Sequence, residues 1–164
     1  MLETSRRNDA PNACSSGADE KPQLIIGRQY FKSVLPLIKN ARISIDILMF
    51  HWAWYERDLT CEISLLNAAI VGASKRGVKV RCYVSMPASF KKLKSLGLNT
   101  RLYSGSGVMH AKVLIFDSRI AVFGSHNFSQ RAMLFNKEVS MILYEKSAVL
   151  QLERYFETLW RNNK

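Results

Sequence analysis

Two short polar segments enclose a mostly apolar stretch late in the chain, in the sequence HAKVLIFDSRIAVFGSHN. His110 and Lys112 open it two residues apart, and residues two apart on a β-strand point to the same face. Ser125 and Asn127 close it with the same spacing. Because a polar turn joins the two apolar runs between them, we expect an antiparallel hairpin that brings all four side chains to one end.

An imidazole, an ammonium, a hydroxyl and an amide at one place suit an anionic phosphoryl group. The ammonium and the neutral donors can hold the non-bridging oxygens, while the imidazole acts as a nucleophile or carries a proton. Each residue alone is ordinary, because histidine and lysine are common at the rims of sheets and Gly-Ser-x-Asn is common in turns. The combination indicates a site for phosphoryl chemistry.

The pattern H-x-K-x4-D followed by G-S-x-N resembles the HKD motif of the phospholipase D superfamily. The positions that carry it are His110, Lys112, Asp117, Gly124, Ser125 and Asn127. Glu138, in the segment NKEVSMIL, falls where family members carry a glutamate that orients the histidine and fixes its tautomer. The segments ISIDILMF and RGVKVRCYVS also look like the leading strands of the family, and the resemblance extends over residues 24–162.

The resemblance implies a reaction through a covalent phosphohistidine. His110 would attack phosphorus, and a second His110 would protonate the leaving oxygen and then activate water. Lys112 and Asn127, together with Ser125, would hold the non-bridging oxygens. Asp117 lies at the far end of the strand, so we expect it to support the turn or an interface and not to contact substrate. No metal or other cofactor is expected, because Lys112 and the two imidazoles supply the positive charge.

Most phospholipase D enzymes carry two HKD motifs in one chain, and this sequence contains one. It therefore resembles the short single-motif branch of the family, in which two copies build one active site across a two-fold axis. We expect an active homodimer and an inactive monomer. The cysteines, Cys14, Cys61 and Cys82, lack the spacing of a zinc site. This absence favours the bacterial non-specific endonucleases over the mitochondrial Zucchini-type proteins.

The segments around the motif alternate between strand and helix patterns. Strands are expected at 42–50, 78–85, 98–104, 109–116, 120–125 and 138–144, and helices at 24–41, 58–77, 88–97 and 147–162. Because the two strands of the motif are antiparallel neighbours, the pattern predicts an α/β domain with a mixed sheet flanked by helices on both faces.

The chain divides into an N-terminal segment and one domain. Residues 1–22 contain no apolar run, which is typical of a mobile arm and not of a signal peptide, and residues 23–164 are expected to form a single catalytic domain. No apolar run reaches the roughly 18–20 residues that span a bilayer. The localisation stays open: cytoplasmic by default, and periplasmic or membrane-anchored if a further N-terminal segment exists.

Five basic residues are weaker candidates for binding substrate. Lys91, Lys92 and Lys94 form a basic helix face that either follows phosphates or is simply solvated. Arg101 and Arg131 are expected to flank the mouth of the site.

Two further histidines lie near the predicted site. His51 follows the first predicted strand, where family members line the site entrance, but a partly buried histidine beside Trp52 and Trp54 is the favoured interpretation. The two tryptophans could stack on bases of single-stranded nucleic acid, although packing in a core or dimer is favoured for them. His126 is expected to point away from its two neighbours in the motif or to lie at the rim.

A net charge of +11 favours a polyanionic partner. The leading hypothesis is a weakly specific endonuclease acting on DNA, RNA or both. The second is a lipid phosphodiesterase of the phospholipase D or cardiolipin type, which is less favoured because the sequence shows no amphipathic interfacial helix. The third is a catalytically idle dimer that binds nucleic acid.

Overall fold

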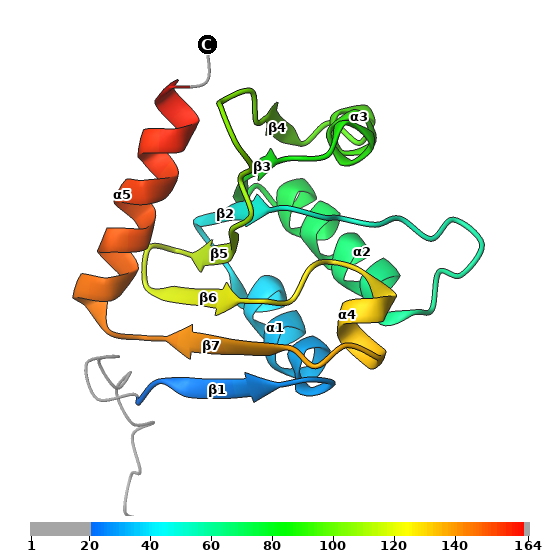
Figure 1. Cartoon of the computed structure of the whole chain (residues 1–164), viewed down its shortest axis with the longest axis horizontal. Helices are drawn as coiled ribbons and strands as arrows, with labels where there is room; N and C mark the ends of the chain where they lie inside the picture. Colours follow the sequence, from blue (N-terminus) through cyan, green and yellow to red (C-terminus); the bar gives the residue numbers. More distant parts are fainter. Residues whose placement is uncertain (1–20, 163–164) are drawn as a thin grey trace, which may run out of the picture.

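The computed structural model describes residues 21–162, so the predicted arm of residues 1–22 lies outside the described residues except for its last two. The described residues form one seven-stranded sheet, in the order β1-β7-β6-β5-β2-β3-β4, with helices on both faces (Figure 1). The strands are β1 (Gln23–Ile26), β2 (Ser44–Met49), β3 (Lys79–Val84), β4 (Asn99–Leu102), β5 (Lys112–Phe116), β6 (Ile120–Gly124) and β7 (Val139–Leu143). The helices are α1 (Gln29–Asn40), α2 (Glu62–Lys75), α3 (Pro87–Ser95), α4 (Gln130–Leu134) and α5 (Lys146–Asn162).

The sheet combines a parallel and an antiparallel half. Strands β2, β3 and β4 are parallel neighbours, connected through α2 and α3. Strand β2 also pairs with β5 in the antiparallel sense, and β5, β6, β7 and β1 continue the antiparallel half. The predicted mixed α/β sheet is therefore confirmed.

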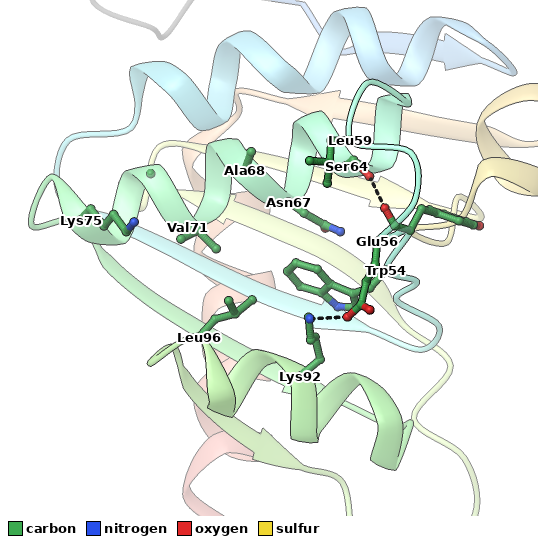
Figure 2. A pocket seen from close by; sticks show the side chains of 12 residues that line it. Trp54, Glu56, Leu59, Ser64, Asn67, Ala68, Val71, Lys75, Lys92 and Leu96 are labelled. Carbon is green, nitrogen blue, oxygen red and sulfur yellow. Dashed lines mark hydrogen bonds and ion pairs between the residues drawn. The ribbon is translucent and has the colours of Figure 1, made fainter.

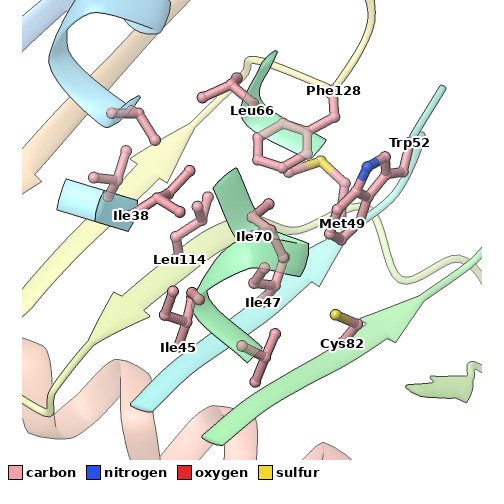
Figure 3. Close-up of a cluster of buried hydrophobic side chains, with 14 of the residues drawn as sticks. Ile38, Ile45, Ile47, Met49, Trp52, Leu66, Ile70, Cys82, Leu114 and Phe128 are labelled. Carbon is pink, nitrogen blue, oxygen red and sulfur yellow. The ribbon is translucent and has the colours of Figure 1, made fainter. Parts of the chain in front are cut away.

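Strand β2 lies near the middle of the sheet and is buried on both faces, which suits its nearly continuous apolar sequence. Ile45, Ile47 and Met49 face the larger apolar cluster, where they meet α1, α2 and β5 (Figure 3). Leu48 faces the opposite way, into a second cluster under α5. Strand β2 is thus a rigid support for β5, the strand that begins with Lys112 of the HKD motif and pairs with β2.

Helix α5 covers the other face of the sheet (Figure 1). Its buried side chains, Val149, Phe156 and Trp160, repeat at helical spacing and pack on the β-strands below. No helix within residues 21–162 is long and apolar enough to cross a membrane.

Several elements differ from the sequence prediction, and β1 and α4 were not predicted at all. Residues 23–26 form an edge strand that pairs with β7, and the helix expected from residue 24 begins only at Gln29. Gly27, with a φ of +50°, makes the turn between them. Helix α4 was not predicted, because a single turn of five residues is too short to show a helical repeat.

The strand register brings the motif segments to one edge of the sheet. Met49 at the end of β2 lies opposite Lys112 at the start of β5. Gly124 at the end of β6 lies opposite Ser140 in β7. The loops that carry the predicted site residues therefore meet at this edge.

Candidate active site

His110 and Lys112 are in direct contact. The Lys112 Nζ lies 3.0 Å from Nδ1 and 3.1 Å from Nε2 of His110, and it also donates to the His110 carbonyl oxygen at 2.7 Å. The predicted strand was too long at its start, because β5 begins at Lys112 and His110 lies in the preceding loop. The two side chains meet because the lysine chain folds back over the loop, and strand alternation plays no part.

Lys112 is buried and His110 is exposed. Burial lowers the pKa of the Lys112 ammonium, while the nearby Glu138 carboxylate acts in the opposite direction. A cation held in a partly desolvated position interacts more strongly with an incoming anion than a cation in open water. The pair thus combines an exposed imidazole with a fixed positive charge.

Phe50 forms a wall of the site that the sequence did not reveal. Its ring centroid lies 4.6 Å from that of His110 and 5.2 Å from the Lys112 Nζ. Phe50 follows β2 directly, so the pairing of β2 with β5 brings it there. The one signal in the sequence was its place at the end of the first predicted strand.

Asn127 is oriented by a backbone group. The His51 N–H donates to the Asn127 Oδ1 at 3.2 Å, and the Phe128 N–H donates to the His51 carbonyl at 3.0 Å. Since the amide oxygen is used, the amide nitrogen is the group that can donate to a phosphoryl oxygen. The interpretation of His51 as a partly buried histidine was wrong, because its side chain is exposed and its backbone does the positioning.

Gly124 and Ser125 attach the motif turn to β7. The Ser125 hydroxyl accepts from the Val139 N–H at 3.0 Å and lies 3.3 Å from the Val139 carbonyl, to which it can donate. A Cβ atom at position 124 would lie 2.4 Å from the Ser140 Cα, so only glycine permits this close approach of β6 and β7. The binding of a substrate oxygen by Ser125 stays a prediction.

His126 points into the core between the two outward-facing residues of the motif. It is fully buried, with Nδ1 2.7 Å from the Ser140 hydroxyl and Nε2 2.9 Å from the Gly27 carbonyl, and its ring stacks on Tyr30. A carbonyl only accepts, so Nε2 carries the proton and Nδ1 accepts from Ser140. Burial lowers the pKa of His126, opposed by the Gly27 hydrogen bond and the Glu138 carboxylate. His126 therefore links the motif turn to β7 and to the turn before α1.

Glu138 is buried beside these groups. Its carboxylate accepts from the Asn136 side-chain amide at 2.9 Å, and its carbonyl accepts from the Gly27 N–H. Among the described residues its carboxylate makes this bond and none to His110, so the orientation of the imidazole by Glu138 stays a prediction. Within residues 21–162 no cluster of three or more His, Cys, Asp or Glu side chains is placed to hold a metal ion.

Asp117 lies outside the site, at the opposite end of β5. Its carboxylate accepts from the backbone N–H groups of Arg42, Ile43 and Ser44, at 3.0, 2.7 and 2.9 Å. These bonds fix the segment that enters β2. The motif aspartate thus bonds to the backbone that enters β2, and its absence from the reaction stays a prediction.

The weaker basic candidates divide into two groups. Lys91, Lys94 and Arg131 are exposed, and their contact with substrate stays a prediction. Lys92 is ion-paired with Glu56 at 2.7 Å. Arg101 was expected at the mouth, but its guanidinium donates to the Trp160 carbonyl at the end of α5 and lies over the Trp160 ring, where a cation stabilises the helix terminus.

Residues 34–160 match the family model described as "Cardiolipin synthase, PLD-like domain". The match covers most of the chain and includes every element from β2 to β7. The chain therefore belongs to the phospholipase D-like family.

Curated relatives carry two kinds of name. The "5'-3' exonuclease PLD3" of Xenopus laevis is 30% identical over 152 residues, which cover 82% of this chain and 31% of the relative. The human "Mitochondrial cardiolipin hydrolase" is 27% identical over 158 residues, which cover 93% of this chain and 57% of the relative. The chain spans about a third of the length of the exonuclease and somewhat over half of the hydrolase.

Two solved structures share the fold over nearly their whole length. Nuc of Salmonella typhimurium, a phospholipase D family member, superposes with a TM-score of 0.73 at 21% identity, covering 88% of this chain and 97% of its own. NucT from Helicobacter pylori gives a TM-score of 0.68 at 23% identity, covering 86% and 96%. The predicted membership of the family and its fold are confirmed.

Proposed function

We propose that this chain hydrolyses phosphodiester bonds in nucleic acid as a weakly specific endonuclease that needs no metal. The observation that carries the proposal is the contact of the Lys112 ammonium with both ring nitrogens of His110, at 3.0 and 3.1 Å. A phosphate bound to this ammonium lies beside the nucleophile. Lys112 then supplies the positive charge that a metal ion supplies in other phosphodiesterases.

The proposed reaction has two steps. In the first, a ring nitrogen of His110 attacks phosphorus and forms a P–N bond. The P–O bond to the leaving strand breaks, and the leaving oxygen takes a proton from a second imidazole. In the second, that imidazole removes a proton from water, the water oxygen attacks phosphorus, and the P–N bond breaks. Lys112 and the Asn127 amide nitrogen hold the non-bridging oxygens in both steps.

The second imidazole comes from a second copy of the chain. Each copy has one His110, and the proposed reaction uses two. Exposed apolar side chains lie on the segments that meet at the site edge of the sheet, with exposed fractions of 38–69%: Ile26, Met86, Val108, Phe135 and Val139. A two-fold axis through this edge would bury them and bring the two histidines together. Sedimentation velocity combined with activity over a dilution series tests this, since activity per chain should fall as the dimer dissociates.

Nucleic acid is the favoured substrate because of the charge and the relatives. The net charge of +11 attracts a polyanion, and a relative over 82% of this chain is named an exonuclease. The second candidate is a lipid phosphodiesterase, favoured by the cardiolipin hydrolase whose similarity extends over 93% of this chain. The bond cleaved is of the same type in both cases.

One panel of substrates separates these candidates. Plasmid DNA, single-stranded RNA and cardiolipin vesicles are incubated in EDTA with the wild type, His110→Ala and the control Lys146→Ala, an exposed residue at the start of α5. We expect the wild type and the control to cut nucleic acid, and His110→Ala to be inactive. Hydrolysis of lipid alone would select the second candidate. Activity that EDTA abolishes and a divalent ion restores would contradict the proposed mechanism, and binding without cleavage would indicate an idle binding protein.

A further inference from the structure

A cavity of about 540 Å³ opens between α2 and α3, beside the loop that leaves β2 (Figure 2). Trp54 lies between the two helices, Val71 and Leu96 form apolar walls, and Lys75 and Lys92 lie at the rim. Its volume lies within the range of pockets that bind small organic molecules, roughly 300–1,000 Å³. None of the motif residues lines it, so it is distinct from the HKD site.

The cavity begins close to the catalytic centre. The His51 N–H holds the Asn127 amide, and Trp54 follows only three residues later. Three residues span at most about 11 Å between their Cα atoms. A strand whose phosphate is bound at Asn127 therefore has its neighbouring nucleotides within reach of the cavity.

The side chains of the cavity suit a base attached to a phosphate backbone. The Lys92 ammonium lies 5.8 Å from the centroid of the Trp54 ring and is paired with Glu56 at 2.7 Å. A base can pack on the indole while a phosphate competes with the exposed Glu56 for the ammonium, and Lys75 offers a second cation.

The lining of the cavity combines an aromatic surface with two cations, Trp54 with Lys75 and Lys92. This combination suits an occupant that joins a ring to a neighbouring phosphate, as a nucleotide does and an acyl chain does not. The cavity thus fits a nucleobase better than a lipid tail.

We propose that this cavity holds one unpaired base of the substrate strand, near the scissile phosphate, with Trp54 as its packing surface. The proposal rests on the nuclease function proposed above. It gives the enzyme a preference for single-stranded over duplex nucleic acid, because a paired and stacked base cannot enter.

The test uses a single-stranded oligonucleotide with one abasic residue, and a sequencing gel reads the cutting at every linkage. For the wild type we expect a dip in the cutting pattern: at linkages a fixed distance from the abasic residue, the cutting rate falls on the order of tenfold. This factor corresponds to the loss of one base-stacking contact. Trp54→Leu should cut more slowly and without this dip, and Trp54→Phe should restore it. Tyr155→Leu, an exposed aromatic on α5, is the matched control and should show the wild-type pattern.

A second variant keeps the test valid if Trp54→Leu fails to fold. Ala68→Trp fills the cavity from the exposed side of α2 and should also remove the dip. An even cutting pattern in the wild type, or a dip that persists in Trp54→Leu, would overturn the inference while leaving the nuclease function intact. Absence of cutting on the unmodified oligonucleotide would instead overturn the nuclease function and this inference with it. Weakened hydrolysis of cardiolipin vesicles by Trp54→Leu, with an unchanged dip, would assign the cavity to an acyl chain.

Discussion

Replacement of His126 by phenylalanine tests whether the residue inside the G-S-x-N turn holds the catalytic turn in place. The substitution keeps an aromatic ring that can stack on Tyr30 but removes both ring nitrogens. The Ser140 hydroxyl and the Gly27 carbonyl then lose partners at 2.7 and 2.9 Å in a buried place. Each buried group left without a partner costs about 1–3 kcal/mol, so we expect the free energy of unfolding to fall by about 2–6 kcal/mol.

The same variant should change the pH dependence of stability. Burial lowers the pKa of His126 in the folded protein. In the unfolded chain the pKa of this histidine is ~6.5. Below pH ~6.5 the unfolded chain takes up a proton that the folded protein resists, so this contribution to stability is complete above pH ~6.5 and is lost as the pH falls. The slope is at most ~1.4 kcal/mol per pH unit, and it ends at the lower pKa of the folded protein.

Urea denaturation at several pH values between 5 and 7.5 measures both effects, and kcat with nucleic acid reports on the turn. We expect His126→Phe to lose stability at neutral pH, to show a shallower decline towards pH 5, and to lose kcat because Asn127 is displaced. His51→Phe is the matched control for stability alone, because the His51 imidazole is exposed. Lys146→Ala, at an exposed position at the start of α5, is the control for kcat. A loss below 0.5 kcal/mol, or a pH slope equal to that of the wild type, would refute the role assigned to His126.

Three further substitutions test the structural assignments. Gly124→Ala should lower the melting temperature and abolish activity, because its Cβ would lie 2.4 Å from the Ser140 Cα; wild-type activity would contradict the close approach. Asp117→Ala removes the acceptor of three backbone N–H groups, so urea denaturation should show a loss of about 2–4 kcal/mol of stability, while the folded protein keeps its kcat. A loss of kcat without a loss of stability would place Asp117 in the reaction. Lys112→Met should lower kcat by about 10²-fold or more with a smaller change in melting temperature, since it removes the fixed charge, whereas the control Lys146→Met should leave kcat unchanged.

Local patterns in the sequence predicted the fold class, which the structure confirms, and the order of residues that meet at one edge of the sheet. The alternation of strand and helix patterns gave a mixed α/β sheet, because burial on one or both faces leaves a periodic signal in neighbouring residues. The HKD pattern predicted His110, Lys112 and Asn127 as site residues, and their catalytic roles stay predictions. The contact between the first two is local, with only one residue between them.

Errors arose where a short segment depends on a distant partner. Residues 23–26 are a strand only because β7 lies beside them, and a segment of four residues carries no period that separates a strand from a helix. Arg101 was predicted to flank the mouth of the site, which stays a prediction, and the structure adds a hydrogen bond to the Trp160 carbonyl, 59 residues away in the sequence. Its position in the sequence contains no information about that partner.

The sequence by itself determined the phospholipase D-like family and the mixed sheet, and it predicted a phosphoryl site at the HKD motif. Only the tertiary structure decided what holds that site. Asn127 is oriented by the backbone of His51 at a separation of 76 residues, His126 is bound by Gly27 at 99, and Asp117 serves the start of β2 at 73. The physical reason is that periodicity reports which face of an element is buried. Hydrogen-bond partners depend instead on which strands and loops lie side by side in the folded sheet.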